Sequence, residues 1–134
     1  MVGKLKLSDL EKHLLRKRVV AFSGRMSKKS AARIVEKLKI LHGRLDTEVV
    51  LTLDCPKGGN PEGSRAIMQQ MDAMKSSNIC ITTVGRGSGV SSAGAYVLLA
   101  GSKRLCWENV DLFLHAPLII ESYDQNIWQL YTCL

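Results

Sequence analysis

The sequence predicts an α/β fold in which repeated β-α-β crossover units build a mainly parallel sheet. Short apolar, β-branched runs alternate with longer segments that place apolar residues at helical spacing. Glycine closes several of the apolar runs, as is typical where a strand passes into a loop. The chain has 134 residues, 46% of them hydrophobic and 23% charged, which is enough for one globular core.

The first half of the chain alternates helix and strand. Residues 5–18 are expected to form a basic helix with leucines on one side, followed by a buried strand over 18–24. Ser27 is the expected N-cap of a helix that stops at Gly43. Residues 48–54 form the next expected strand, and their nearly continuous apolar run predicts burial on both faces of the sheet.

The second half continues the alternation. Its expected elements are a helix over 61–75 with methionines in the core, a strand over 78–85, a glycine- and serine-rich loop, a helix over 92–101, short strands over 103–107 and 111–115, and a helix in the tail. We therefore expect two parts, a basic N-terminal helical segment (residues 1–17) and one αβ domain (residues 18–134).

Charge and cysteine content narrow the function classes. The net charge of +7 raises the question of a polyanion partner, but the chain lacks the aromatic residues among its basic ones that stack on bases, so no nucleic acid partner is predicted. The four cysteines form no C-x-x-C pair, and Cys80 and Cys106 are expected as reduced, buried thiols. No secretory segment or apolar run of about 18 residues is present, which favours a cytoplasmic protein with no membrane partner.

In parallel sheets of this kind, functional residues collect in the loops that follow the carboxyl ends of strands. Two common nucleotide-binding motifs, the P-loop and the dinucleotide fingerprint, do not fit these loops. Gly58 and Gly63 have P-loop spacing, but the lysine that should follow is missing. Gly85 and Gly87 begin a dinucleotide fingerprint, but Val90 stands where its third glycine belongs.

Nucleophilic catalysis fits these loops better. Ser92 is expected at the first turn of a helix, where free amides favour developing negative charge, although an ordinary N-cap is the alternative. His115 ends an apolar strand and is a candidate general base, or else a structural histidine. Gly58 and Gly59 form either part of an oxyanion hole or a plain tight turn.

Four segments in order resemble the Clp protease proteolytic subunit. They are "RVVAFSGRMS", "LDCPKGGNPEG", "GVSSAGAYVLLAGSKRLCW" and "DLFLHAPL", which span roughly residues 18–118. The resemblance implies the ClpP/crotonase fold. It also implies a serine endopeptidase subunit of an oligomeric chamber, in a ring of like or mixed ClpP-like subunits, with an unfoldase ATPase partner and peptide substrates.

The resemblance also implies roles for individual residues. Ser92 matches the nucleophile, His115 the general base, and the amides of Gly58 and Ala93 the oxyanion hole. Neither a metal nor a cofactor is required. The substrate-binding residues that it implies are Gly59, Asn60 and Leu118.

The chain departs from the family pattern at several points. Lys57 is inserted before the glycine pair, and Ile119 and Ile120 replace two glycines. The family's catalytic acid has no counterpart; Asp111 and Asp124 are the nearest carboxylates in the sequence, and the domain is expected to lack the usual C-terminal part. An inactive ClpP-like subunit that acts as a scaffold or regulator is therefore the alternative, and a crotonase-type acyl-CoA binder ranks below both.

Overall fold

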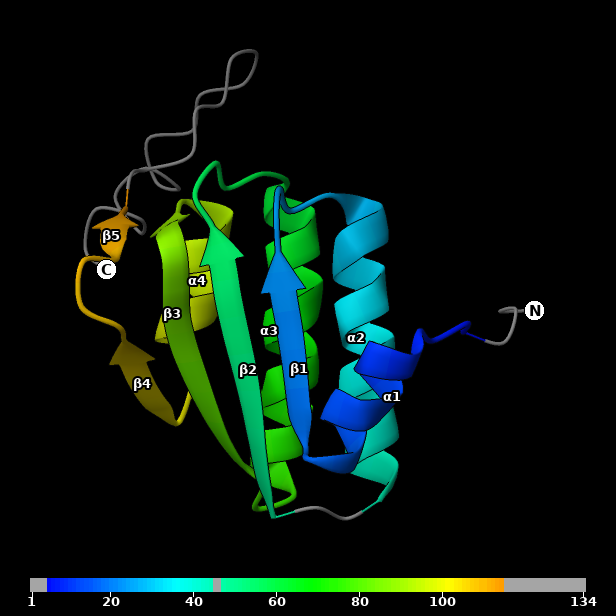
Figure 1. Cartoon of the computed structure of the whole chain (residues 1–134). Coiled ribbons are helices and arrows are strands. Elements are labelled where there is room, and N and C mark those ends of the chain that lie inside the picture. Colours follow the sequence, from blue (N-terminus) through cyan, green and yellow to red (C-terminus); the bar gives the residue numbers. More distant parts are fainter. Residues whose placement is uncertain (1–4, 45–46, 115–134) are drawn as a thin grey trace.

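The computed structural model describes residues 5–44 and 47–114 and has an α/β architecture (Figure 1). The elements follow in the order α1 (Asp9–Arg16), β1 (Val19–Ser23), α2 (Lys28–Gly43), β2 (Glu48–Cys55), α3 (Pro61–Ser76), β3 (Cys80–Ser91), α4 (Ala93–Leu99), β4 (Lys103–Cys106) and β5 (Asp111–Phe113). The predicted alternation of strands and helices is confirmed over the described residues, and the predicted tail helix lies outside them.

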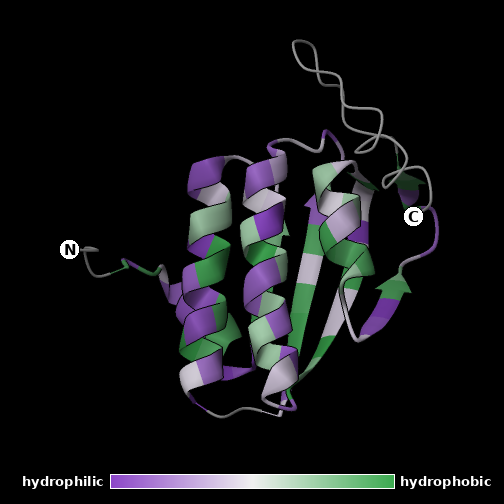
Figure 2. Cartoon of the chain, turned by 180° about the vertical axis from the view of Figure 1, so that it is seen from behind, coloured by the Kyte–Doolittle hydropathy of each residue, from purple (hydrophilic) through white to green (hydrophobic). Residues whose placement is uncertain are grey.

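The five-stranded sheet has the order β1-β2-β3-β4, and β5 pairs with the end of β3. All four pairings are parallel. Each crossover steps to the next neighbour in the same direction, so crossovers of one hand place their helices on one face. Figures 1 and 2 show α2, α3 and α4 together on that face of the sheet.

Burial along β2 follows from this one-sided arrangement. Val49, Leu51 and Leu53 are buried beneath the helices, whereas Val50 and Thr52, which point the other way, are half-buried. The prediction that this strand is buried on both faces is therefore wrong. The apolar run in the sequence could not distinguish a sheet covered on one face from a sheet covered on both.

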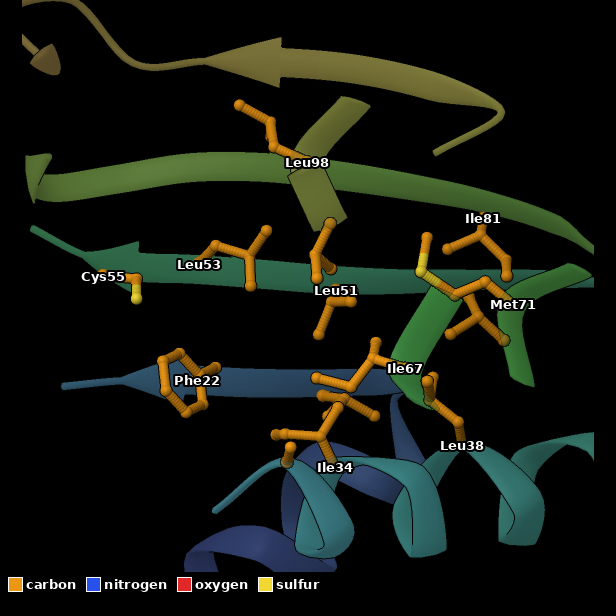
Figure 3. Close-up of a cluster of buried hydrophobic side chains, with 14 of the residues drawn as sticks. Phe22, Ile34, Leu38, Leu51, Leu53, Cys55, Ile67, Met71, Ile81 and Leu98 are labelled. Carbon is orange, nitrogen blue, oxygen red and sulfur yellow. The ribbon is translucent and has the colours of Figure 1, made fainter. Parts of the chain in front are cut away.

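The core lies between the sheet and helices α2 and α3 (Figure 3). Leu38 of α2, Ile67 and Met71 of α3, and Leu51 and Leu53 of β2 all belong to this core, and all five side chains have 0% exposure. Each contributes about 1.5–3 kcal/mol through its removal from water. The predicted core role of the methionines in α3 is confirmed.

The ends of α2 and α1 show how local sequence sets helix boundaries. The Ser27 hydroxyl accepts a hydrogen bond from the Ser30 amide at 3.0 Å, which confirms the predicted cap. At the N-terminus, Ser8 and Glu11 form a capping box that starts α1 at Asp9, so this helix is shorter than predicted.

Two predictions for the second half are wrong. β3 does not stop at Gly85 but continues through the glycine- and serine-rich segment to Ser91, because β5 supplies a new pairing partner. Cys106 is exposed rather than buried, since its strand β4 ends the described order of the sheet. Within the described residues, no helix has both the length and the hydropathy needed to cross a membrane.

Candidate active site

Ser92 lies where β3 turns into α4, at the edge of the sheet where β1, β2 and β3 end; we call this the carboxyl edge. Its backbone has φ +51° and ψ −114°, a region that residues with a side chain rarely adopt. Ser92 holds the N-cap position of α4, yet its hydroxyl makes no capping hydrogen bond. A strained serine whose hydroxyl is not used by its own helix differs from an ordinary N-cap.

The loop that follows β2 packs directly against this serine. A Cβ atom at Gly58 would lie 2.7 Å from Ser92 Cβ and 3.4 Å from its Oγ, and Gly58 itself has φ +65°. Only glycine therefore fits beside the serine. The structure brings together two of the predicted site residues that are 34 positions apart in the sequence.

The two predicted oxyanion amides differ in their surroundings. The Gly58 amide donates to Cys55 O at 3.4 Å, longer than a typical N–H···O bond, so it is weakly engaged. Ala93 is buried at the first turn of α4, where amides have no partner within the helix. Both amides therefore belong to segments that can present donors near Ser92.

Gly59 and Asn60, predicted to bind substrate, hold the loop in place. A Cβ atom at Gly59 would overlap the carbonyl of Met26, and the Asn60 amide donates to that same carbonyl at 2.7 Å. The Asn60 side chain caps α3 by accepting from the Glu62 amide at 2.8 Å. A role for either residue in peptide binding stays a prediction.

Strand β5 leads the chain toward the same serine. Gly89, Val90 and Ser91 pair with Asp111–Phe113, and the Ser92 amide donates to Phe113 O at 2.8 Å. His115 and Leu118 lie outside the described residues, as does Asp124. Asp111 is exposed and pairs with Gly89.

The family model for Clp protease matches residues 3–129 of this chain. The chain belongs to the Clp protease family. Its structure is similar to the crystal structure of the ClpP protease catalytic domain from Plasmodium falciparum, with a TM-score of 0.75 and 20% sequence identity. That match covers 97% of this chain and 70% of the other. The likeness shows the ClpP fold and confirms the resemblance seen in the sequence.

In this Clp protease family member, Cys55 packs beside the candidate site, although the sequence did not indicate it as a site residue. Its side chain has 0% exposure, its Sγ donates to Gly58 O at 3.4 Å, and a Cβ atom at Gly94 would lie 2.7 Å from Cys55 Cβ. Burial raises the pKa of the Cys55 thiol, so the group is neutral and supports the site by packing. Its place at the end of a strand, directly before the loop, was the available signal.

Among the described residues, one serine and one histidine contact each other far from the carboxyl edge. His42 Nε2 lies 3.0 Å from Ser77 Oγ, at the ends of α2 and α3. The C-terminal ends of α2 and α3 lie near the starts of the strands (Figure 1). This pair is therefore remote from the loop after β2 that carries Gly58, which we call the glycine loop. Over the described parts of the chain, no group of three or more His, Cys, Asp or Glu residues could hold a metal ion.

Proposed function

We propose that the chain is a ClpP-like serine endopeptidase subunit that cleaves peptides by acyl transfer. The observation that carries this proposal is the geometry of Ser92. Its backbone is strained, its hydroxyl is not used by α4, and it packs against a glycine that leaves no room for a side chain. Family membership supports the same reaction class.

The proposed reaction has two halves. Ser92 Oγ attacks the peptide carbonyl carbon while His115 takes its proton, and the amides of Gly58 and Ala93 stabilise the oxyanion that forms. The C–N bond then breaks as His115 returns the proton to the leaving amine. A water molecule, activated by the same imidazole, releases the acyl group from Ser92.

Chain connectivity supports the role of His115. It follows Phe113 by two residues, and two residues span at most about 7 Å. Phe113 O already accepts a hydrogen bond from the Ser92 amide. His115 is therefore attached, within two residues, to a strand that is hydrogen-bonded to the backbone of Ser92, the proposed nucleophile.

Among the described residues, we assign no carboxylate as the acid that would orient the imidazole. Loss of such an acid from a serine protease triad costs on the order of 10⁴ in rate. We further propose, on family membership, that it acts within an oligomeric ring of ClpP-like subunits, served by an unfoldase ATPase.

Labelling with a fluorophosphonate probe tests the proposal. The wild type and Ser91→Ala, the neighbouring hydroxyl, should be labelled, whereas Ser92→Ala should not. A folded wild type that resists labelling, or a Ser92→Ala variant that is labelled, would contradict the proposal. Resistance to labelling together with co-assembly with an active ClpP subunit would support a non-catalytic partner instead.

A further inference from the structure

Strand β3, which leads into Ser92, contains a bulge. β2 and β3 pair in register as far as Leu53 and Gly85, but the next pair joins Cys55 to Val90. Over this interval β2 advances by two residues and β3 by five, so β3 carries three extra residues. Bulges of this kind bend a strand and redirect the side chains that follow.

Asp54 of β2 fills this bulge. Its Oδ1 accepts hydrogen bonds from the Ser88 amide at 3.3 Å and the Ser88 hydroxyl at 3.4 Å. A Cβ atom at Gly87 would overlap the Asp54 carboxylate, and Gly87 has φ +75°. The backbone of Asp54 is held in turn, because its carbonyl accepts from the Gly24 amide at 2.9 Å.

The bulge divides β3 into two parts with different partners. Before it, residues 82–85 pair with β4. After it, residues 89–91 pair with β5 and lead directly into Ser92. On the β2 side, only the pair between Cys55 and Val90 follows the bulge. The position of this second part relative to β2 therefore depends on how the bulge is closed.

We propose that Asp54 is a positioning residue for Ser92. Its carboxylate closes the bulge and so holds residues 89–92 against the loop that carries Gly58, which belongs to the same strand-loop unit as Asp54. The effect on catalysis rests on the proposed function. The closure of the bulge by the Asp54 carboxylate, which we call the anchor, does not. Asp54 forms no ion pair among the described residues. Its carboxylate therefore acts on the bulge as a hydrogen-bond acceptor rather than through its charge.

Hydrogen–deuterium exchange tests the anchor without any need for activity. Asp54→Ala should raise amide exchange in residues 86–92 and 111–113 by on the order of tenfold, because Ser88 loses its acceptor. Asp54→Asn keeps an acceptor oxygen and should stay near the wild type. Glu48→Ala, at the exposed start of the same strand, is the matched control and should change nothing there.

Gly87→Ala is a second test of whether Asp54 closes the bulge. It should raise exchange in the same segments, and by a smaller factor in an Asp54→Ala background, where the carboxylate no longer blocks the added methyl group. Wild-type exchange in Asp54→Ala would overturn the anchor. If Asp54→Ala unfolds the whole domain, Gly87→Ala decides alone: wild-type exchange in residues 86–92 and 111–113 of that variant would overturn the anchor.

The labelling rate of Ser92 tests the catalytic consequence. Asp54→Ala should lower the rate of fluorophosphonate labelling by about tenfold, and Asp54→Asn should restore it. For peptide hydrolysis the loss should fall on kcat with little change in KM. Normal labelling despite raised exchange would overturn the positioning role. A wild type that is never labelled would refute the proposed peptidase instead, and exchange alone would then decide the anchor.

Discussion

The carboxyl edge and the contact between α1 and α2 are held together by opposite means. At the carboxyl edge, backbone segments approach so closely that Gly58, Gly59 and Gly87 cannot carry side chains. At the other contact, Glu11 of α1 binds Arg33 and Lys37 of α2 at 2.6 and 2.5 Å. The first region is sensitive to added atoms, and the second is sensitive to a lost charge.

The largest effect is expected from an added methyl group at the carboxyl edge. Gly59→Ala places its Cβ atom on the Met26 carbonyl at φ +141°, so we expect a loss of at least about 3 kcal/mol in the free energy of unfolding. Gly43→Ala is the control, because nothing lies within 4 Å of its added Cβ. Chemical denaturation measures both, and equal stabilities would contradict the close approach.

A smaller effect is expected at the α1–α2 contact. Glu11→Ala leaves Lys37, whose side chain is only 8% exposed, without its partner. We expect a loss of about 2 kcal/mol, below the range for fully buried pairs because Arg33 reaches solvent. Glu36→Ala removes the exposed pair with Lys39 and should cost less than about 0.5 kcal/mol. A Glu11 variant no less stable than this control would show that the contact adds nothing.

The pH dependence of stability at the α1–α2 contact should be smaller still. The hydrogen bond from Arg33 holds the pKa of Glu11 well below its usual range, against the opposing effect of burial. This stabilisation is complete above the unfolded pKa of about 4.3 and is lost progressively as the pH falls below it. Urea unfolding at pH 6 and pH 3 should show that the wild type loses more stability than Glu11→Gln. Equal losses would mean that the Glu11 carboxylate gains nothing from Arg33 on folding.

Local sequence patterns determined much of the fold. Apolar β-branched runs marked the strands, Ser27 marked the start of α2, and helical spacing marked the core methionines. These features depend on neighbours within one turn or one strand, so a single sequence contains them. The glycine loop at Gly58 and the serine at Ser92 were identified as site candidates for the same reason.

Features that depend on distant partners were not predictable in this way. The glycine-rich segment before Ser92 looks like a loop in the sequence, but pairing with β5 makes it strand. Leu10 of α1 is 65% exposed despite its place in an apolar stripe, because the burial of a helix face depends on what packs against it. Helices on one face of the sheet left the other side of β2 half-buried, which no apolar run reveals.

By itself, the sequence determined the order of strands and helices, the choice of parallel pairing and the family to which the chain belongs, because local periodicity and short motifs specify these. Only the tertiary structure decided that Gly58 lies against Ser92 and that Asp54 fills a bulge in β3. Those contacts join segments some 34 residues apart. Their geometry follows from strand register and crossover direction, which are properties of the packed sheet rather than of any local stretch.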